Sequence, residues 1–427
     1  MGTLFKKLNK LKAFRDLDEK EFAWVLYDVG NSAFTMLTCS LIPIWFKSLA
    51  KGHITGDQAT AYYSIAVAIV TIIVALLGPV CGALADRKDC KMKFFSGTVA
   101  LGTIGCVING FSLNWLLFLI VYVIAKIFYS ASLTFYDSML NDITTEARMD
   151  EVSSYGYAWG YIGSCIPFAL ALIAYVLGPD MLGVIPDPLP QIIGCVITAA
   201  WWLIVSLPLI KNYKQTNYAE GAITSIGEVF KKIGRTIRHI AVNDKKVLFF
   251  LIAFFLYIDG VGTIIDNCIN IGTDLGLPTV GQVVFLLATQ VVAWIFSLIF
   301  AKLSKKYDTV RLILVCIVGY FCVCLYALTL HTLLGFGILA FGVGCFQGSI
   351  QSLSRSYFSK IIPPENSGEY FGIYDIFAKG ASFLGSAVIA VVKLAGGTIN
   401  IAVASLAVFF LFGFIFLKMA DKQTAVK

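Results

Sequence analysis

The stretch Tyr27-Asp28-Val29-Gly30-Asn31-Ser32-Ala33-Phe34 decides how this chain can fold. It lies inside the first long apolar segment, residues 22–49, yet it carries a carboxylate and an amide. Placing a carboxylate near the centre of a bilayer costs about 2.5–3.5 kcal/mol on insertion scales, so such groups usually face a protein interior or a water-filled cavity. The stretch therefore predicts a membrane protein whose helices surround a polar cavity, with Asp28 turned toward that cavity.

The composition of the whole chain supports this prediction. Of the 427 residues, 58% are hydrophobic and 14% are charged, whereas soluble domains contain about 25% charged residues. An apolar segment of about 20 residues crosses a bilayer as a helix. Twelve such segments follow one another: 22–49, 60–85, 94–112, 114–137, 156–178, 190–210, 246–272, 279–303, 310–330, 332–357, 370–393 and 398–418. We therefore expect an all-α membrane protein with twelve transmembrane helices.

Lys and Arg are distributed unequally between the loops on the two sides of the membrane. An even number of spans places both termini on one side. Of the 33 Lys and Arg residues, Lys47, Lys51 and Lys393 lie in loops of the other side, and Lys126 and Lys379 lie within spans. The remaining 28 share the side of the termini, and the positive-inside rule predicts that this side is cytoplasmic. The first segment is too long for a signal peptide, so we expect it to be retained.

The two halves of the chain repeat each other. Residues 84–88, after the second span, correspond to residues 303–307, after the eighth. Tyr27-Asp28-Val29-Gly30 in the first span resembles Tyr257-Ile258-Asp259-Gly260 in the seventh. Repeat halves of six helices place a substrate site at their interface, near the middle of the membrane. We expect a cytoplasmic N-terminal segment (1–21), a first six-helix bundle (22–210), a cytoplasmic linker with an amphipathic helix (211–245), a second six-helix bundle (246–418) and a cytoplasmic tail (419–427).

The loop between the second and third spans carries a recognisable pattern. Gly82-Ala83-Leu84-Ala85-Asp86-Arg87-Lys88-Asp89-Cys90-Lys91 resembles the signature loop of the major facilitator superfamily, G-x-L-a-D-r-x-g-r-[rk]. Asp89 and Cys90 stand where the family pattern has Gly and Arg, and Lys305 replaces the acid in the second-half copy. The resemblance implies that Asp86 and the basic residues of the loop hold helix ends together on the cytoplasmic side.

Further stretches resemble one branch of this superfamily, the vacuole-effluxer-like proteins, whose fungal members are described as autophagy-related amino-acid effluxers. These stretches are residues 27–34, 152–163, 257–265, 351–356 and 371–379. The resemblance implies a major facilitator fold of two pseudo-symmetric six-helix bundles. It also implies a transporter that exports amino acids or related metabolites. We expect an integral, multi-pass protein of a bacterial plasma membrane with both termini in the cytoplasm.

Candidate coupling residues follow from the same resemblance. In the superfamily, spans one, four, seven and ten line the cavity, and polar residues of this chain fall on those spans at helical spacing. Asp28 is the first candidate for ion coupling, because a carboxylate whose solvation changes between two states can take up and release a proton. A fixed ion pair, for example with Lys126, is the alternative. Asp259 and Asp266 are further coupling candidates, with helix packing and the headgroup region as their alternatives.

Two other sets of residues are candidates for substrate binding and for gating. The predicted cavity residues are Asn31, Thr35, Lys126, Tyr129, Tyr257, Asn267, Gln347 and Gln351. The predicted cytoplasmic gating residues are Asp86, Arg87, Asp137, Arg355, Asp375 and Lys379. Asp375 and Lys379 lie four residues apart on one helix, where they can neutralise each other. Lys126 and Arg355 suit a substrate carboxylate or phosphate, but the position of Arg355 near the cytoplasmic end favours gating.

No motif in the sequence indicates an enzyme. A Walker loop of the form GxxxxGK[ST] is missing, so ATP-driven transport is not expected, and the 11 Cys include no CxxC pair for a metal. We expect a monomeric secondary transporter that works by alternating access, without cofactor, metal or nucleic acid. Its expected partners are a small-molecule substrate, a proton or other coupling ion, and membrane lipids. A lipid or lysolipid transporter and a non-transporting receptor or scaffold are the alternatives.

Overall fold

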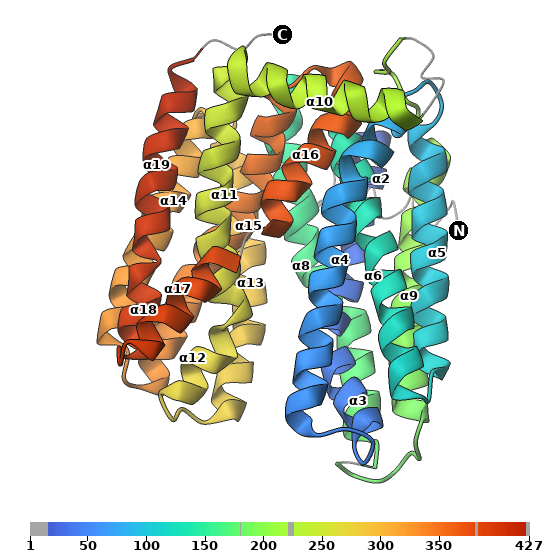
Figure 1. Ribbon diagram of the computed structural model, residues 1–427, viewed down its shortest axis with the longest axis vertical. Helices are drawn as coiled ribbons and strands as arrows, with labels where there is room; N and C mark the ends of the chain where they lie inside the picture. Colours follow the sequence, from blue (N-terminus) through green and yellow to red (C-terminus); the bar gives the residue numbers. More distant parts are fainter. Residues whose placement is uncertain (1–15, 180, 221–225, 381–382, 424–427) are drawn as a thin grey trace.

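The computed structural model describes residues 16–179, 181–220, 226–380 and 383–423 (Figure 1). Within these residues the chain is helical, and the one β contact is an isolated bridge between Lys51 and Ile54. Twelve helical segments of the described residues are long and apolar enough to cross a membrane. The prediction of an all-α protein with twelve spans is confirmed.

The first bundle is built from the N-terminal half of the chain. Its helices are α2 (Glu19–Cys39), α3 (Leu41–Ala50), α4 (Gly56–Ala85), α5 (Lys91–Phe111), α6 (Trp115–Ser138), α7 (Leu140–Ile143), α8 (Met149–Val176) and α9 (Leu189–Asn212). Asp18 determines where α2 begins, because its carboxylate accepts hydrogen bonds of 2.8 Å from the backbone N–H groups of Lys20 and Glu21. Such a cap satisfies donors that have no partner in the first turn of a helix.

The second bundle is built from the C-terminal half of the chain. Its helices are α11 (Lys245–Asp266), α12 (Cys268–Asp274), α13 (Thr279–Leu303), α14 (Thr309–Tyr326), α15 (Leu333–Ile361), α16 (Ser367–Gly380), α17 (Phe383–Leu394), α18 (Ile399–Ser405) and α19 (Ala407–Asp421). The eleventh span consists of α16 and α17. Asp259 of α11 is fully buried, and its carboxylate accepts a hydrogen bond of 2.8 Å from the N–H of Gly385. A carboxylate stabilises the N-terminus of a helix, so Asp259 stabilises the start of α17.

Matching contacts in the two bundles show their pseudo-symmetry. The hydroxyl groups of Tyr27 on α2 and Ser132 on α6 are hydrogen-bonded at 2.6 Å. Those of Tyr257 on α11 and Ser354 on α15 are hydrogen-bonded at the same distance. All four residues are buried. The first and fourth helices of each half therefore pack on each other in the same way, as the sequence repeats predict.

The segment between the bundles contains α10 (Ile226–Val242), which lies across one end of the molecule (Figure 1). We term this end the linker end. Val229 and Ile233, one turn apart, are buried against α4 of the first bundle. Lys232 forms an ion pair of 3.0 Å with Glu369 in the first turn of α16. The helix α10 therefore contacts both bundles.

The bundles meet in the half of the molecule nearest the linker end. Gly82 of α4 and Gly368 of α16 are in close contact. A Cβ added at Gly82 would lie 2.0 Å from the carbonyl oxygen of Gly368, and a Cβ added at Gly368 would lie 2.6 Å from the carbonyl oxygen of Gly82. Small residues let two helices pack backbone to backbone. At the opposite end, α3 and α12 are far apart (Figure 1). We term this arrangement the linker-closed conformation.

Candidate functional site

Arg355 of α15 lies at the centre of the contacts between the two bundles. It is 2% exposed. Its Nη2 is 3.3 Å from Oδ2 of Asp28 on α2, and its Nη1 is 3.0 Å from Oδ1 of Asp137 on α6. Buried charges are tolerated when they are paired and hydrogen-bonded. The structure thus joins one cation of the second bundle to two carboxylates of the first, and we term Asp28, Asp137 and Arg355 the charge cluster.

The remaining surroundings of the Arg355 guanidinium also come from the first bundle. Its Nε donates to the hydroxyl of Ser153 at 2.9 Å, and its Nη2 donates to the Ser153 carbonyl at 3.1 Å. The ring centroids of Trp24, Tyr157 and Tyr136 lie 4.5, 4.6 and 5.3 Å from its Cζ. Guanidinium groups bind carboxylates with a rigid fork and stack on aromatic faces. The site is therefore shaped for arginine rather than for a cation of any kind.

The position of Asp28 depends on its neighbours on α2, α6 and α8. Tyr136 donates its hydroxyl to Oδ2 at 2.7 Å, and the Asn31 amide donates to Oδ1 at 3.2 Å. A Cβ at Gly156 of α8 would lie 2.4 Å from Oδ2 of Asp28 and 3.1 Å from Nη2 of Arg355. The absence of a side chain at position 156 therefore lets the carboxylate reach the guanidinium.

The charge cluster carries an excess of negative charge. One guanidinium faces two carboxylates, and both carboxylates are largely shielded from water, with 10% and 17% of their side-chain surfaces exposed. Burial disfavours unbalanced charge, and a proton on either carboxylate would remove the imbalance.

Lys126 is not the partner of Asp28, and the alternative of a pair between these two residues is wrong. Its Nζ donates to the hydroxyl of Thr38 at 3.1 Å and lies 4.8 and 5.7 Å from the ring centroids of Tyr129 and Phe34. Thr38 is ten residues beyond Asp28 on α2, a distance of about 15 Å along the helix. Lys126 therefore lies farther from the linker end than Asp28 does.

Lys126 belongs to a second group of charges, which lies between the bundles. Asp266, at the exposed end of α11, and Lys379 of α16 are close enough for their charges to act on Lys126. The exposed Cys39 lies within reach of the charges of Lys126 and Asp266. In the first bundle, Thr35 and Tyr129 share a hydrogen bond. The structure thus brings these predicted residues together on both sides of the space between the bundles.

Of the other predicted cavity residues of the second bundle, Gln347 reaches Tyr161 of α8 in the first bundle, and the following three contact residues of their own bundle. Gln351 donates its amide to the Gln347 carbonyl at 3.1 Å, one turn earlier on α15. Asn267 follows the last residue of α11 and donates to the Thr263 carbonyl at 3.0 Å. Tyr257 is fully buried inside the bundle, against α15. The structure does not bring these residues to the charge cluster.

Asp86 of the signature loop is fully buried at the linker end. Its two carboxylate oxygens accept hydrogen bonds from the N–H groups of Gly368 at 2.7 Å and Glu369 at 2.9 Å, in the first turn of α16. Lys91 lies 3.8 Å away. Burial raises the pKa of Asp86 to about 6, although Lys91, the two N–H groups and Lys232 act in the opposite direction. A carboxylate of the first bundle thus caps a helix of the second.

Asp375, Lys379 and Arg87 are the remaining gating candidates. The expected pair of Asp375 and Lys379 is present, with an N–O distance of 2.8 Å. Asp375 also accepts a hydrogen bond from Thr134 of the first bundle, so it too joins the bundles. Arg87 is half-buried beside Asp86. Asp86, Asp375 and the charge cluster are therefore separate connections between the two halves.

Several residues that surround the charge cluster were not predicted from the sequence. Trp24 lies one turn before Asp28 on α2. Ser153, Gly156 and Tyr157 share one face of α8 at the spacing i, i+3, i+4. This face combines a hydroxyl, an aromatic ring and a residue without a side chain, a signal that could have marked α8 as part of the site.

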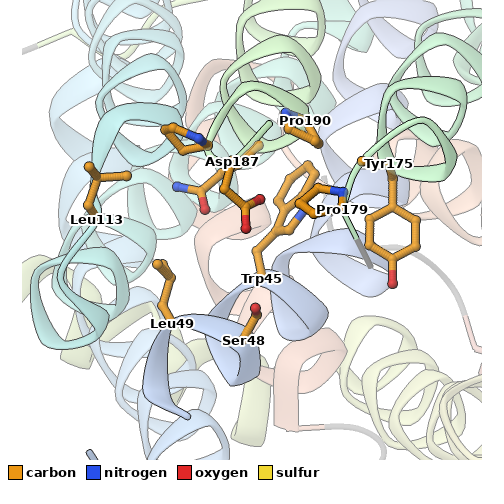
Figure 2. A pocket seen from close by; sticks show the side chains of 11 residues that line it. Trp45, Ser48, Leu49, Leu113, Tyr175, Pro179, Asp187 and Pro190 are labelled. Atoms are coloured by element: carbon orange, nitrogen blue, oxygen red, sulfur yellow. The ribbon is translucent and has the colours of Figure 1, made fainter. Parts of the chain in front are cut away.

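A separate cavity of about 210 Å³ lies in the first bundle, at the end opposite the linker end. Figure 2 shows Trp45 and Ser48 of α3 below Asp187 and Pro190, with Tyr175 at the side. All the residues that line this cavity belong to the first bundle. This cavity therefore lies within one bundle and is not part of the contacts between the two bundles.

Comparisons with known proteins agree with this arrangement. Residues 142–427 match the family described as "Vacuole effluxer Atg22 like". The chain is 39% identical over 411 residues to the MFS-type transporter YxiO of Bacillus subtilis (strain 168), which covers 95% of this chain and 96% of that protein. It is 25% identical over 293 residues to autophagy-related protein 22 of Botryotinia fuckeliana (strain B05.10), and this alignment covers 60% of this chain. The aligned part spans about half (48%) of this fungal relative.

Solved structures share the fold at low sequence identity. The human organic anion transporter MFSD10 (TETRAN) has a TM-score of 0.71 at 12% identity and covers 92% of this chain and 97% of its own. The proton:xylose symporter XylE has a TM-score of 0.69 at 12% identity and covers 94% of both chains. FucP in the outward conformation has a TM-score of 0.66 at 16% identity, and the match covers 94% of this chain and 98% of FucP. These similarities show the major facilitator fold.

Proposed function

Because this chain belongs to the vacuole effluxer Atg22-like family of major facilitator transporters, we propose that it moves a small solute by alternating access and couples this movement to protons through the charge cluster. The observation that carries the proposal is the position of Arg355, a residue of the second bundle buried between two carboxylates of the first. Opening the linker end separates the bundles and therefore breaks these ion pairs. The charge state of Asp28 and Asp137 is in this way linked to the conformation.

The proton step follows from this linkage. In the linker-closed conformation, Arg355 supplies the counter-charge of Asp28 and Asp137. When the bundles separate at the linker end, both carboxylates lose this cation and face the water of that side. A proton that binds to Asp28 there replaces the missing positive charge, and the return of Arg355 releases it. We propose Asp28 as the main proton site, with Asp259 and Asp266 as further coupling sites.

The substrate that we propose is an amino acid or a related metabolite. Lys126 of the first bundle and Asp266 of the second carry opposite charges and act on each other across the space between the bundles. Such a pair suits the carboxylate and the ammonium group of a zwitterion. The family description as effluxers supports export as the direction. We propose that the linker end is cytoplasmic, in a bacterial plasma membrane, as the basic loops and the Bacillus relative suggest.

Flux through proteoliposomes tests this function. We would load vesicles with pooled labelled amino acids, impose a proton gradient, and compare wild type with Asp28→Asn and Asp137→Asn. Asp274→Asn is the matched control, because Asp274 forms an exposed ion pair of 2.6 Å with Lys393 within the second bundle. We expect gradient-driven flux in wild type and in the control, and its loss in Asp28→Asn. Transport against a gradient by folded Asp28→Asn protein would exclude the coupling role, and no flux of any amino acid in wild type would exclude the substrate class.

A further inference from the structure

A groove lies on the side of the first bundle that is formed by α4, α5 and α6. The helices α4, α5 and α6 are neighbours (Figure 1) and enclose a groove of about 340 Å³. Leu77 of α4 and Leu101 of α5 line this groove, and each is about half exposed. All three helices are transmembrane spans. The exposed apolar side chains therefore face the hydrocarbon region of the bilayer, and the groove opens toward lipid.

The interior of the groove offers nothing to a polar ligand. The hydroxyl of Thr98 donates to the carbonyls of Phe94 and Phe95, both at 2.9 Å. The hydroxyl of Thr134 is engaged with the Ser130 carbonyl and with Asp375. Next to these residues, a Cβ at Gly97 would meet no atom within 4 Å. The groove is thus open and apolar, which suits an acyl chain.

The mouth of the groove carries a single positive charge. Lys93 lines the groove near the start of α5, at the linker end, and its side chain is exposed. In the described part of the chain, Lys93 takes part in none of the ion pairs. Lys91, two residues earlier, is instead buried and paired with Asp86 and Asp142. A cation above an apolar groove at the membrane surface is complementary to the headgroup of an anionic phospholipid.

We propose that this groove holds one acyl chain of an anionic phospholipid from the leaflet at the linker end, with the phosphate of the lipid on Lys93. From Lys93 to Leu101 the groove follows α5 for about 12 Å, which fits the upper part of a chain. The chain would lie beside Thr134, which donates to Asp375 of the second bundle. The bound lipid is therefore adjacent to one of the connections that close the linker end.

Native mass spectrometry of the purified full-length protein tests this proposal. The protein would be equilibrated with equal amounts of phosphatidylglycerol and phosphatidylcholine in mixed micelles, and the retained lipid would be identified by mass. Gly97→Trp fills the groove. Gly56→Trp is its matched control, because a Cβ at Gly56, at the other end of α4, also meets no atom within 4 Å. Lys93→Gln removes the positive charge at the mouth of the groove. Its control is Lys302→Gln, because Lys302 is also an exposed lysine and lies in the last turn of α13.

We expect wild type, Gly56→Trp and Lys302→Gln to retain one phosphatidylglycerol molecule, and Gly97→Trp to lose it. Lys93→Gln should keep a lipid but lower the preference for phosphatidylglycerol about fivefold. Retention of the lipid by Gly97→Trp, or an unchanged preference in Lys93→Gln, would overturn the proposal. If Gly97→Trp does not give folded protein, Gly97→Leu takes its place. A further result would also overturn the proposal. If the protein moved labelled phosphatidylglycerol across the bilayer, and only Gly97→Trp and Lys93→Gln abolished this movement, the groove would be a transport route and not a site with a resident lipid.

Discussion

Replacing Arg355 with glutamine tests whether the charge cluster holds the linker end closed. The substitution removes ion pairs of 3.3 and 3.0 Å and leaves Asp28 and Asp137 buried without a counter-charge. Removing one partner of a buried ion pair costs about 3–5 kcal/mol. Asp28 keeps its hydrogen bonds from Tyr136 and Asn31, which favours the lower end of this range. A loss of about 3 kcal/mol shifts the equilibrium toward the linker-open conformation about a hundredfold.

The thiol of Cys39 can report this equilibrium. It is exposed at the last residue of α2, far from the linker end, and lies within reach of the charges of Lys126 and Asp266 on the two bundles. We expect a membrane-impermeant maleimide, added from the side opposite the linker end, to label Cys39 in wild type. In Arg355→Gln the labelling should be far slower, because opening of the linker end brings the bundles together at the opposite end.

The comparison needs two controls. Cys322 is also exposed, so all variants would carry Cys322→Ala. Arg148→Gln is the matched charge control, because Arg148 pairs with Glu21 at 2.8 Å within the first bundle and leaves the contacts between the bundles unchanged. Size-exclusion chromatography would show that each variant is folded. Equal labelling rates for Cys39 in wild type, Arg355→Gln and Arg148→Gln would refute the reasoning.

Three further predictions use the same preparations. Gly156→Ala places a methyl group 2.4 Å from the carboxylate of Asp28, so gradient-driven flux should fall severalfold. Gly234→Ala is the control and should transport like wild type, because a Cβ at Gly234 would meet no atom within 4 Å. Asp89 has a φ of 57° where the family pattern has Gly, and Gly adopts this left-handed conformation without the steric cost that other residues have. Asp89→Gly should therefore raise the free energy of unfolding by about 0.5–1 kcal/mol. Thermal denaturation measures this change, and an unchanged or lower melting temperature would contradict the prediction. Because burial raises the pKa of Asp86 to about 6, the linker-closed conformation binds a proton there more tightly than an open one, in which the carboxylate has its ordinary pKa of about 4. The linker-closed population should therefore rise as the pH falls from about 6 to about 4, and this gain should be lost as the pH rises again. The measurement is the labelling rate of Cys39 at each pH, divided by the rate in Asp86→Asn at the same pH. A ratio that does not change with pH would exclude this role of Asp86.

The number of spans and the repeat could be predicted because both depend on local properties of the sequence. A run of about 20 apolar residues needs no knowledge of its neighbours to be identified as a span. The matching positions of Tyr27 and Tyr257 likewise predict matching packing, and the structure shows it as two hydrogen bonds of 2.6 Å. The contact of Asp259 with the eleventh span was not predicted. Asp259 accepts a hydrogen bond from the N–H of Gly385, which belongs to a different span, and such a contact leaves no local signal in the sequence.

The partner of Asp28 could not be predicted for a different reason. Helical spacing shows which residues share a face of one helix, but it does not show how deep each lies or how the helices are rotated. Lys126 and Arg355 are both cations on cavity-lining spans, and Arg355 is 327 residues away from Asp28. Depth decides between them, because Lys126 reaches Thr38 near the far end of α2. That information exists only in the packing of the two halves.

The two copies of the signature loop join the bundles with opposite arrangements of charge. In the first copy the loop supplies the acid, and Asp86 accepts hydrogen bonds from the start of α16. In the second copy the loop carries Lys305 in place of the acid, and Lys305 pairs with Glu151 in the first turn of α8 at 2.8 Å. Asp150, in the same turn, accepts from Lys360 of the second bundle at 2.7 Å. Because the N-terminus of a helix stabilises negative charge, α8 can supply the acids that the loop has lost. Each loop therefore meets the first turn of a helix of the other bundle, with the acid on the loop in the first copy and on the helix in the second.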